Sequence, residues 1–341
     1  MTAPLDSPPP HRPADGPAPK SATLGLSQWF HYGDVEGVRR VRGLLDELGC
    51  RHLRCGVSWA DFVRPDGEAW YRTQFRELAG LDLLVCVNFT PPSVSKGNSC
   101  NSPPKRLDDF GDWVAQILRL YGEHIGAVEL WNEPNVPVYW DYHNWDADFR
   151  SIALMTAHAA KECRAAGVPA VMGGISSVNG GYLGWLRNWG ALDELDVLAV
   201  HQFPGMWWPG RAAWTLPRDF RGEWPGTMRQ LRRHAGRPDG TARPCWVTET
   251  GFATFDPAAN APALYEEQCD RLRAAAACPA ERVYWYSVED LDPRRDAVEG
   301  FHEEEPEYHL GLVTFPEAGR SGTKKPAWHV MKELLEERGR A

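Results

Sequence analysis

The chain has 341 residues, of which 43% are hydrophobic and 24% charged, so it can bury a large core and is not a disordered protein. Its 37 Lys and Arg residues against 46 Asp and Glu residues give a formal charge of −9, which argues against a nucleic-acid partner because phosphate backbones would be repelled. Tryptophan is abundant, with 16 residues, and composition alone gives no reason for it.

The two ends of the chain differ in composition. Residues 1–21 hold seven of the 28 prolines, so we expect a disordered tail before a single domain at 22–341. The tail lacks the basic start and apolar stretch of a secretory signal, and no later segment reaches the roughly 18 apolar residues of a membrane span. We therefore expect a cytoplasmic protein with no membrane partner. The eight cysteines are scattered without C-x-x-C pairs, which favours reduced, buried thiols.

From residue 22 onward, short apolar runs alternate with longer stretches of helical period. The expected strands are 23–29, 52–57, 83–89, 127–131, 170–174, 197–201, 245–248 and 283–287. The expected helices are 35–48, 71–79, 107–124, 147–166, 182–192, 227–235, 263–277 and 326–337. A strand followed by a helix, repeated this often, predicts an α/β fold of the (β/α)₈ TIM barrel type, because open sheets usually stop at about five or six strands.

In such a barrel the active site lies at the C-terminal ends of the strands and in the loops that follow them. The side chains at these ends that could carry chemistry are, in chain order, His31, Arg54, Asn88, Asn132, Glu133, His201, Glu249 and Trp285. No glycine-rich phosphate-binding motif follows any expected strand, so we expect no nucleotide cofactor.

Two carboxylates stand out among these side chains. Glu133 and Glu249 each follow a largely hydrophobic strand, and the fourth and seventh strands come close to facing each other across the barrel mouth. Two carboxyl groups across a cleft are the minimal machinery for hydrolysing a glycoside, one as proton donor and one as nucleophile or base. Arg54, if it points inward beside Glu249, would hold that carboxylate ionised.

Two motifs resemble a known group of enzymes. The run WNEPN at 131–135 resembles the fourth-strand signature of clan A glycoside hydrolases, which are retaining (β/α)₈ enzymes that include cellulase-like and β-xylosidase-like families. The run TETGF at 248–252 resembles their seventh-strand nucleophile motif, and the two in this order are more specific than either alone. The resemblance covers the chain from residue 22 to its end.

The resemblance implies roles for individual residues. Glu133 would be the acid/base, Glu249 the nucleophile, and Asn132 the partner of the sugar 2-hydroxyl. Arg54 and His201 match the second-strand arginine and sixth-strand histidine of the clan, and Trp285 its eighth-strand tryptophan.

One position departs from the clan pattern. The clan often carries a tyrosine two positions after that histidine, oriented to the nucleophile, but Phe203 stands here. Either another hydroxyl, such as that of Tyr286, substitutes, or the nucleophile is held less firmly.

The loops after the fourth and sixth expected strands carry further tryptophans. Trp140 and Trp145 follow the fourth strand, and Trp207 and Trp208 follow the sixth. Aromatic rings stack on the apolar faces of sugars, so we expect these rings to line a sugar groove, with packing of the loops as the alternative. His31 and Asn88 are weaker candidates for sugar binding, because such residues often only cap turns.

These observations predict a retaining β-glycoside hydrolase acting by double displacement on a small β-glycoside or oligosaccharide. A β-xyloside or β-glucoside is favoured, and neither a cofactor nor a metal is expected. The alternatives are a transglycosidase on the same site, a catalytically silent sugar-binding barrel, and a metal-dependent sugar isomerase. The acidic run HEEE at 302–305 is expected to be a solvated loop. For retention, we expect the two carboxyl groups to lie about 5 to 5.5 Å apart.

Overall fold

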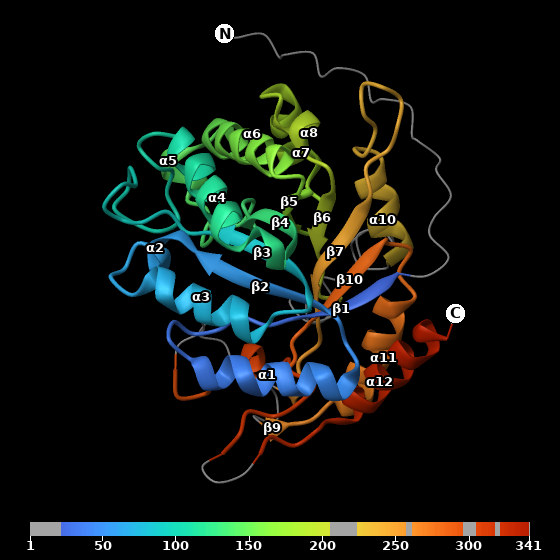
Figure 1. Ribbon diagram of the computed structural model, residues 1–341. Helices are drawn as coiled ribbons and strands as arrows, with labels where there is room; N and C mark the ends of the chain where they lie inside the picture. Colours follow the sequence, from blue (N-terminus) through green and yellow to red (C-terminus); the bar gives the residue numbers. More distant parts are fainter. Residues whose placement is uncertain (1–21, 205–223, 257–260, 296–304, 318–320, 341) are drawn as a thin grey trace.

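The computed structural model describes residues 22–204, 224–256, 261–295, 305–317 and 321–340 (Figure 1). The predicted tail, Trp207, Trp208 and residues 302–304 of the acidic run lie outside these ranges.

The described residues form a closed barrel of eight parallel strands, which confirms the predicted (β/α)₈ fold. The strands are β1 (Thr23–Ser27), β2 (His52–Ser58), β3 (Asp82–Asn88), β4 (Ile125–Asn132), β5 (Ala170–Ser176), β6 (Leu198–His201), β7 (Cys245–Thr250) and β10 (Arg282–Tyr286). The last strand, β10, closes the ring by pairing with β1, and Leu26 lies opposite Trp285.

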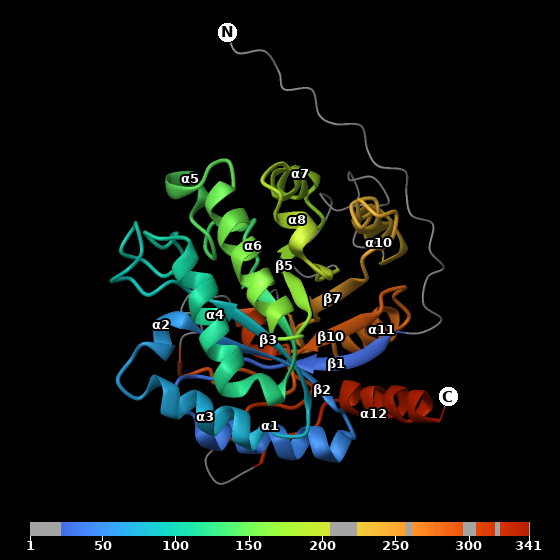
Figure 2. The same ribbon diagram turned by 45° about the horizontal axis from the view of Figure 1, so that its top comes forward.

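Helices surround the barrel on its outer side (Figures 1 and 2). They are α1 (Val35–Leu48), α3 (Gly67–Glu77), α4 (Asp108–Tyr121), α6 (Arg150–Ala165), α7 (Gly180–Asn188), α8 (Ala191–Glu194), α10 (Trp224–Arg232), α11 (Tyr265–Ala276) and α12 (Pro326–Gly339). The single helix predicted at 182–192 is wrong in one respect: Gly190, with a φ of 75°, ends the first helix and α8 follows. None of the helices in the described ranges is long and apolar enough to cross a membrane.

Several short elements were not predicted, because segments of two to five residues are too short to show a period. They are α2 (Trp59–Phe62), η1 (Gly122–His124), α5 (Tyr142–Trp145), η3 (Glu305–His309) and the hairpin of β8 (Phe255–Asp256) with β9 (Ala261–Pro262).

Helix α1 shows why the sequence folds as predicted. Its stripe of Val38, Val41 and Leu45 is buried against the barrel. The Asp34 side chain accepts a hydrogen bond from the Gly37 N–H and so satisfies one free donor at the helix start. Gly49 ends the helix in the left-handed conformation at a φ of 72°, which glycine adopts without steric cost. Caps and apolar spacing together fix both ends of the helix.

Side chains alternate along each strand between the helix layer and the barrel interior. Seven interior residues form a separate apolar floor: Leu84, Ala127, Val171, Val197, Ala199, Trp246 and Tyr284. Because this floor fills the N-terminal half of the barrel, polar side chains further along the same strands gather above it, at the C-terminal end.

Backbone strain gathers at the same end of the barrel. Phe89 follows β3, Trp131 and Glu133 stand at the end of β4, and Ser177 follows β5, all with φ between 40° and 90°. Such conformations cost about 1 to 3 kcal/mol per residue, and they persist where the surroundings impose them, often at functional sites. This end of the barrel is therefore the place to look for chemistry.

Candidate active site

Arg54 lies at the centre of a buried cluster above the apolar floor. It comes from the middle of β2 and its side chain is fully buried. The guanidinium donates from Nε to Glu129 Oε2 at 2.5 Å and from Nη1 to Glu249 Oε1 at 2.5 Å. Its Nη2 donates to Asn132 Oδ1 at 2.9 Å. The structure therefore brings the predicted arginine, asparagine and seventh-strand carboxylate together around one cation.

His201 joins the two predicted catalytic carboxylates. It ends β6 and pairs with Glu249 across the β6–β7 ladder. Its Nδ1 lies 2.8 Å from Glu133 Oε1 and 3.3 Å from Glu249 Oε2. One carboxylate oxygen of Glu133 and one of Glu249 lie within 4.8 Å of each other. The two carboxylates thus face the same small volume at the barrel mouth.

Glu129 also belongs to this cluster, although it was not among the predicted site residues. Its carboxylate is fully buried, and besides Arg54 it accepts from the Gly174 N–H at 3.1 Å and lies 3.7 Å from His201 Nε2. The signal was present, because a glutamate stands between Val128 and Leu130 in an otherwise apolar strand. Such a charge is tolerated in a strand interior only when partners meet it.

The charges of the cluster stabilise one another. Burial alone would raise the pKa of Glu129, but the Arg54 guanidinium and the contact with His201 outweigh it and hold that pKa at about 2. Burial alone would lower the pKa of His201, but the neighbouring carboxylates, Glu249 most strongly, raise it to about 9. Arg54 and His201 are therefore two buried cations at neutral pH.

The WNEPN motif divides into two parts. Asn132 and Glu133 face the cluster, whereas Trp131 lies in the helix-facing core and donates its indole N–H to the Tyr139 carbonyl at 3.0 Å. Asn135 exchanges two hydrogen bonds with the backbone of Ser176, at 2.9 and 3.0 Å. The motif therefore presents two polar groups to the site and uses its other side chains to fix the loop.

Asn88 stands at the inner edge of the same mouth. It ends β3 opposite Ser58, and alternation from Leu84 in the floor puts it on the interior face. It is fully buried, and neither amide atom has a hydrogen-bond partner among the described residues. Because an unsatisfied buried amide costs about 1 to 3 kcal/mol, this side chain is suited to a polar ligand.

Two tryptophans predicted to bind sugar belong to the protein core instead. Trp285 is 1% exposed and packs in the helix-facing core, because Tyr284 takes the interior face and side chains alternate. Trp140 is fully buried, packs edge to face on Trp131 at 5.0 Å and donates to Asp146 Oδ2 at 3.0 Å. Neither indole is available to stack on a substrate.

Of the three other tryptophans predicted to line a sugar groove, only Trp145 lies within the described residues. Trp145, on α5, is 43% exposed. Trp207 and Trp208 lie outside the described residues, so their role in a sugar groove stays a prediction.

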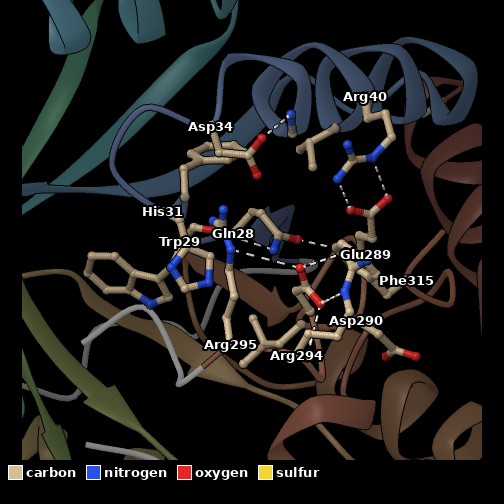
Figure 3. Close-up of a pocket in the computed structure, with 15 residues that line it drawn as sticks. Gln28, Trp29, His31, Asp34, Arg40, Glu289, Asp290, Arg294, Arg295 and Phe315 are labelled. Carbon is tan, nitrogen blue, oxygen red and sulfur yellow. Dashed lines mark hydrogen bonds and ion pairs between the residues drawn. The ribbon is translucent and has the colours of Figure 1, made fainter. Parts of the chain in front are cut away.

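A polar cavity of about 210 Å³ adjoins the cluster, between the end of β1, helix α1 and the segment after β10 (Figure 3). Arg40 points from α1 to Glu289 and pairs with both of its oxygens at 2.8 and 3.2 Å. Gln28 accepts from the Glu289 N–H at 2.9 Å, and the predicted residue His31 lines the same cavity. Trp29 forms the wall between this polar cavity and Glu249.

Glu133, His201 and Glu249 offer one ligand atom each, a grouping that could hold a metal ion. Their chemistry favours ion pairing instead. The Arg54 guanidinium, which pairs with Glu249, would repel a cation at this position.

Comparisons with known proteins show the fold. No protein-family model and no curated protein matches this chain. A family 39 glycoside hydrolase from Bacteroides cellulosilyticus WH2 is 16% identical with a TM-score of 0.63, and the alignment covers 92% of this chain and 63% of that one. A β-glucosidase from Thermotoga maritima is 12% identical with a TM-score of 0.67, covering 93% and 98%. The psychrophilic β-glucosidase of Micrococcus antarcticus is 14% identical with a TM-score of 0.61, covering 94% and 97%. The resemblance to clan A glycoside hydrolases is therefore confirmed at the level of the fold.

Proposed function

We propose that the protein is a retaining β-glycosidase that hydrolyses small β-glycosides or oligosaccharides by double displacement. The observation that carries the proposal is the pair of Glu133 and Glu249 at the ends of β4 and β7, with oxygens within 4.8 Å. Retaining enzymes hold their carboxyl groups about 5 to 5.5 Å apart, and inverting enzymes about 6.5 to 9.5 Å. Oxygens this close agree with the retaining arrangement, which is the one we propose.

In the first step Glu249 attacks the anomeric carbon. The bond from that carbon to the leaving oxygen breaks, and Glu133 gives this oxygen its proton. Arg54 forms an ion pair with the nucleophile at 2.5 Å and holds its carboxylate in place. Arg54 also occupies the Asn132 Oδ1, which turns the amide N–H groups of Asn132 toward the sugar 2-hydroxyl.

In the second step Glu133 acts as the base. It takes a proton from water, the water oxygen attacks the anomeric carbon, and the electron pair of the ester bond returns to Glu249. His201 contacts both carboxylates and so can hold them in place while a proton arrives at Glu133 and leaves it again.

The surroundings of Glu249 suit a neutral, hydroxyl-rich glycone. Asn88, buried at the same barrel mouth, offers an unsatisfied amide that can bind a sugar hydroxyl. We favour a β-glucoside or β-xyloside, and the β-glucosidase names of the structural neighbours support the former.

The test is a panel of aryl β-glycosides assayed with the wild type, Glu133→Gln and Glu249→Ala. We expect Glu249→Ala to abolish turnover and Glu133→Gln to lower it about 10² to 10⁴-fold, the usual contribution of a general acid. Proton NMR of the first-formed sugar should show the β anomer. Full activity of Glu249→Ala, or an α anomer formed first, would overturn the assignment.

The same assay separates the alternatives. Transfer of the glycosyl group to an added sugar acceptor, in place of water, would identify a transglycosidase. Binding without turnover would identify a sugar-binding barrel, and loss of activity on adding a chelator would identify a metal enzyme.

A further inference from the structure

The nucleophile has a hydrogen-bond donor that the sequence analysis did not anticipate. The indole N–H of Trp29, which follows β1, donates to Glu249 Oε1 at 3.3 Å, although the two residues are 220 positions apart. We propose that Trp29 is a positioning residue for Glu249 and speeds release of the sugar from the covalent intermediate. This inference rests on the proposed function.

Two neighbours on β2 fix the position of the Trp29 ring. Gly56 on β2 faces the ring, and a Cβ at that position would lie 1.7 Å from Trp29 Cζ3, so any other residue would push the ring away. The guanidinium carbon of Arg54 lies 5.3 Å from the ring centroid, a cation–π contact. The ring is thus fixed between a strand backbone and a buried cation, and its N–H direction is fixed with it.

Core packing does not account for this placement. Trp29 is only 8% exposed, yet it belongs to neither apolar cluster of the described residues. Its neighbours are Arg54, Glu249 and the polar cavity. A buried indole surrounded by polar groups is placed for its N–H as well as for its ring.

The two oxygens of Glu249 have different partners. Oε1 accepts from both Arg54 and Trp29, whereas Oε2 faces His201 at 3.3 Å and is the oxygen left for the attack. In the glycosyl ester, Oε2 is bonded to the anomeric carbon and Oε1 becomes the carbonyl oxygen. When water displaces the ester, negative charge returns to the carboxylate, and donors to Oε1 stabilise it. During the first step that charge is lost, so the same donors do not help.

This asymmetry predicts a split in the kinetics of Trp29→Phe, which keeps a ring and removes the N–H. A hydrogen bond to a charged group is among the stronger ones in proteins, so we expect the second step to slow about 10-fold or more. The first step, reported by kcat/KM, should change little. The covalent intermediate should then accumulate, with a lower KM and a slower steady state after the burst.

The experiment is stopped-flow hydrolysis of a 2,4-dinitrophenyl β-glucoside or β-xyloside by the wild type, Trp29→Phe and Trp113→Phe. Trp113 is the matched control, because its indole is also buried but its N–H has no partner among the described residues. Gly56→Ala displaces the ring without changing it and should reproduce the split.

The outcomes are distinct. A fall in kcat with kcat/KM retained, in Trp29→Phe and not in Trp113→Phe, supports the inference. Equal falls in both parameters, or behaviour like that of the control, overturn it while leaving the proposed function intact. A wild type that shows neither burst nor turnover overturns the proposed function and this inference with it.

Discussion

Glu129 can be tested by replacing it with glutamine, which has the same shape and no charge. The carboxylate is fully buried on β4, is not one of the proposed reacting groups, and contacts Arg54, His201 and the Gly174 N–H. The change removes a negative charge that faces two buried cations. The glutamine carbonyl can still accept one hydrogen bond from Arg54, whereas the second acceptor, which meets the Gly174 N–H, is lost together with the charge.

The structure gives the expected magnitude. A fall in the pKa of Glu129 from 4.5 to about 2 corresponds to about 3 kcal/mol of favourable interaction with the ionised form. Removing one partner of a buried ion pair costs about 3 to 5 kcal/mol in measured cases. We therefore expect Glu129→Gln to lower the free energy of unfolding by about 3 kcal/mol at pH 7.

The contribution of Glu129 to the free energy of unfolding should depend on pH. Because the folded state lowers the pKa of Glu129, its contribution is fully present above about pH 4.5 and is lost as the pH falls toward 2. The stability difference between wild type and variant, measured by urea unfolding, should therefore be constant from pH 7 to 5 and shrink at lower pH. The pKa of His201 should also drop from about 9, because one carboxylate that raises it is gone. NMR titration of the imidazole measures that drop.

A surface pair provides the control. Glu36 pairs with Arg39 at 2.8 Å, but its side chain is 76% exposed, so Glu36→Gln should cost less than about 1 kcal/mol. A Glu129→Gln variant as stable as this control at pH 7, or a stability difference that does not change below pH 4.5, would refute the reasoning.

Three other changes test separate parts of the structure. Lys325→Met leaves Asp290, its buried partner at 2.7 Å, without a cation and should lower the free energy of unfolding by about 3 to 5 kcal/mol. Adding Asp290→Asn should restore most of that stability. Urea unfolding that shows no such recovery would contradict the ion-pair explanation. Gly174→Ala puts a Cβ 2.1 Å from His201 Nε2, so it should displace the imidazole and lower kcat, and unchanged kcat in aryl glycoside assays would show that the imidazole position is unimportant. Asn88→Leu removes an unsatisfied buried amide and should raise stability by about 1 to 3 kcal/mol while raising KM, whereas an unchanged KM would remove Asn88 from the substrate site.

The local sequence determined the order and nature of the main elements. Apolar runs predicted each strand of the barrel, and helical periods predicted the main helices. These signals are local: the caps of α1, for example, act between residues only a few positions apart. The same locality let the WNEPN and TETGF motifs indicate Glu133 and Glu249 before any geometry was known.

Only the tertiary structure decided which face each side chain takes and which distant groups meet. A shift of one residue along β10 exchanges the helix-facing and interior sides, so Tyr284 lies in the barrel interior and Trp285 in the helix-facing core. The meetings of Glu129 with Arg54 and of Trp29 with Glu249 join strands far apart in the chain. Closure of the barrel creates these contacts, because the register between neighbouring strands, which no short stretch of sequence encodes, sets which side chains meet at its centre.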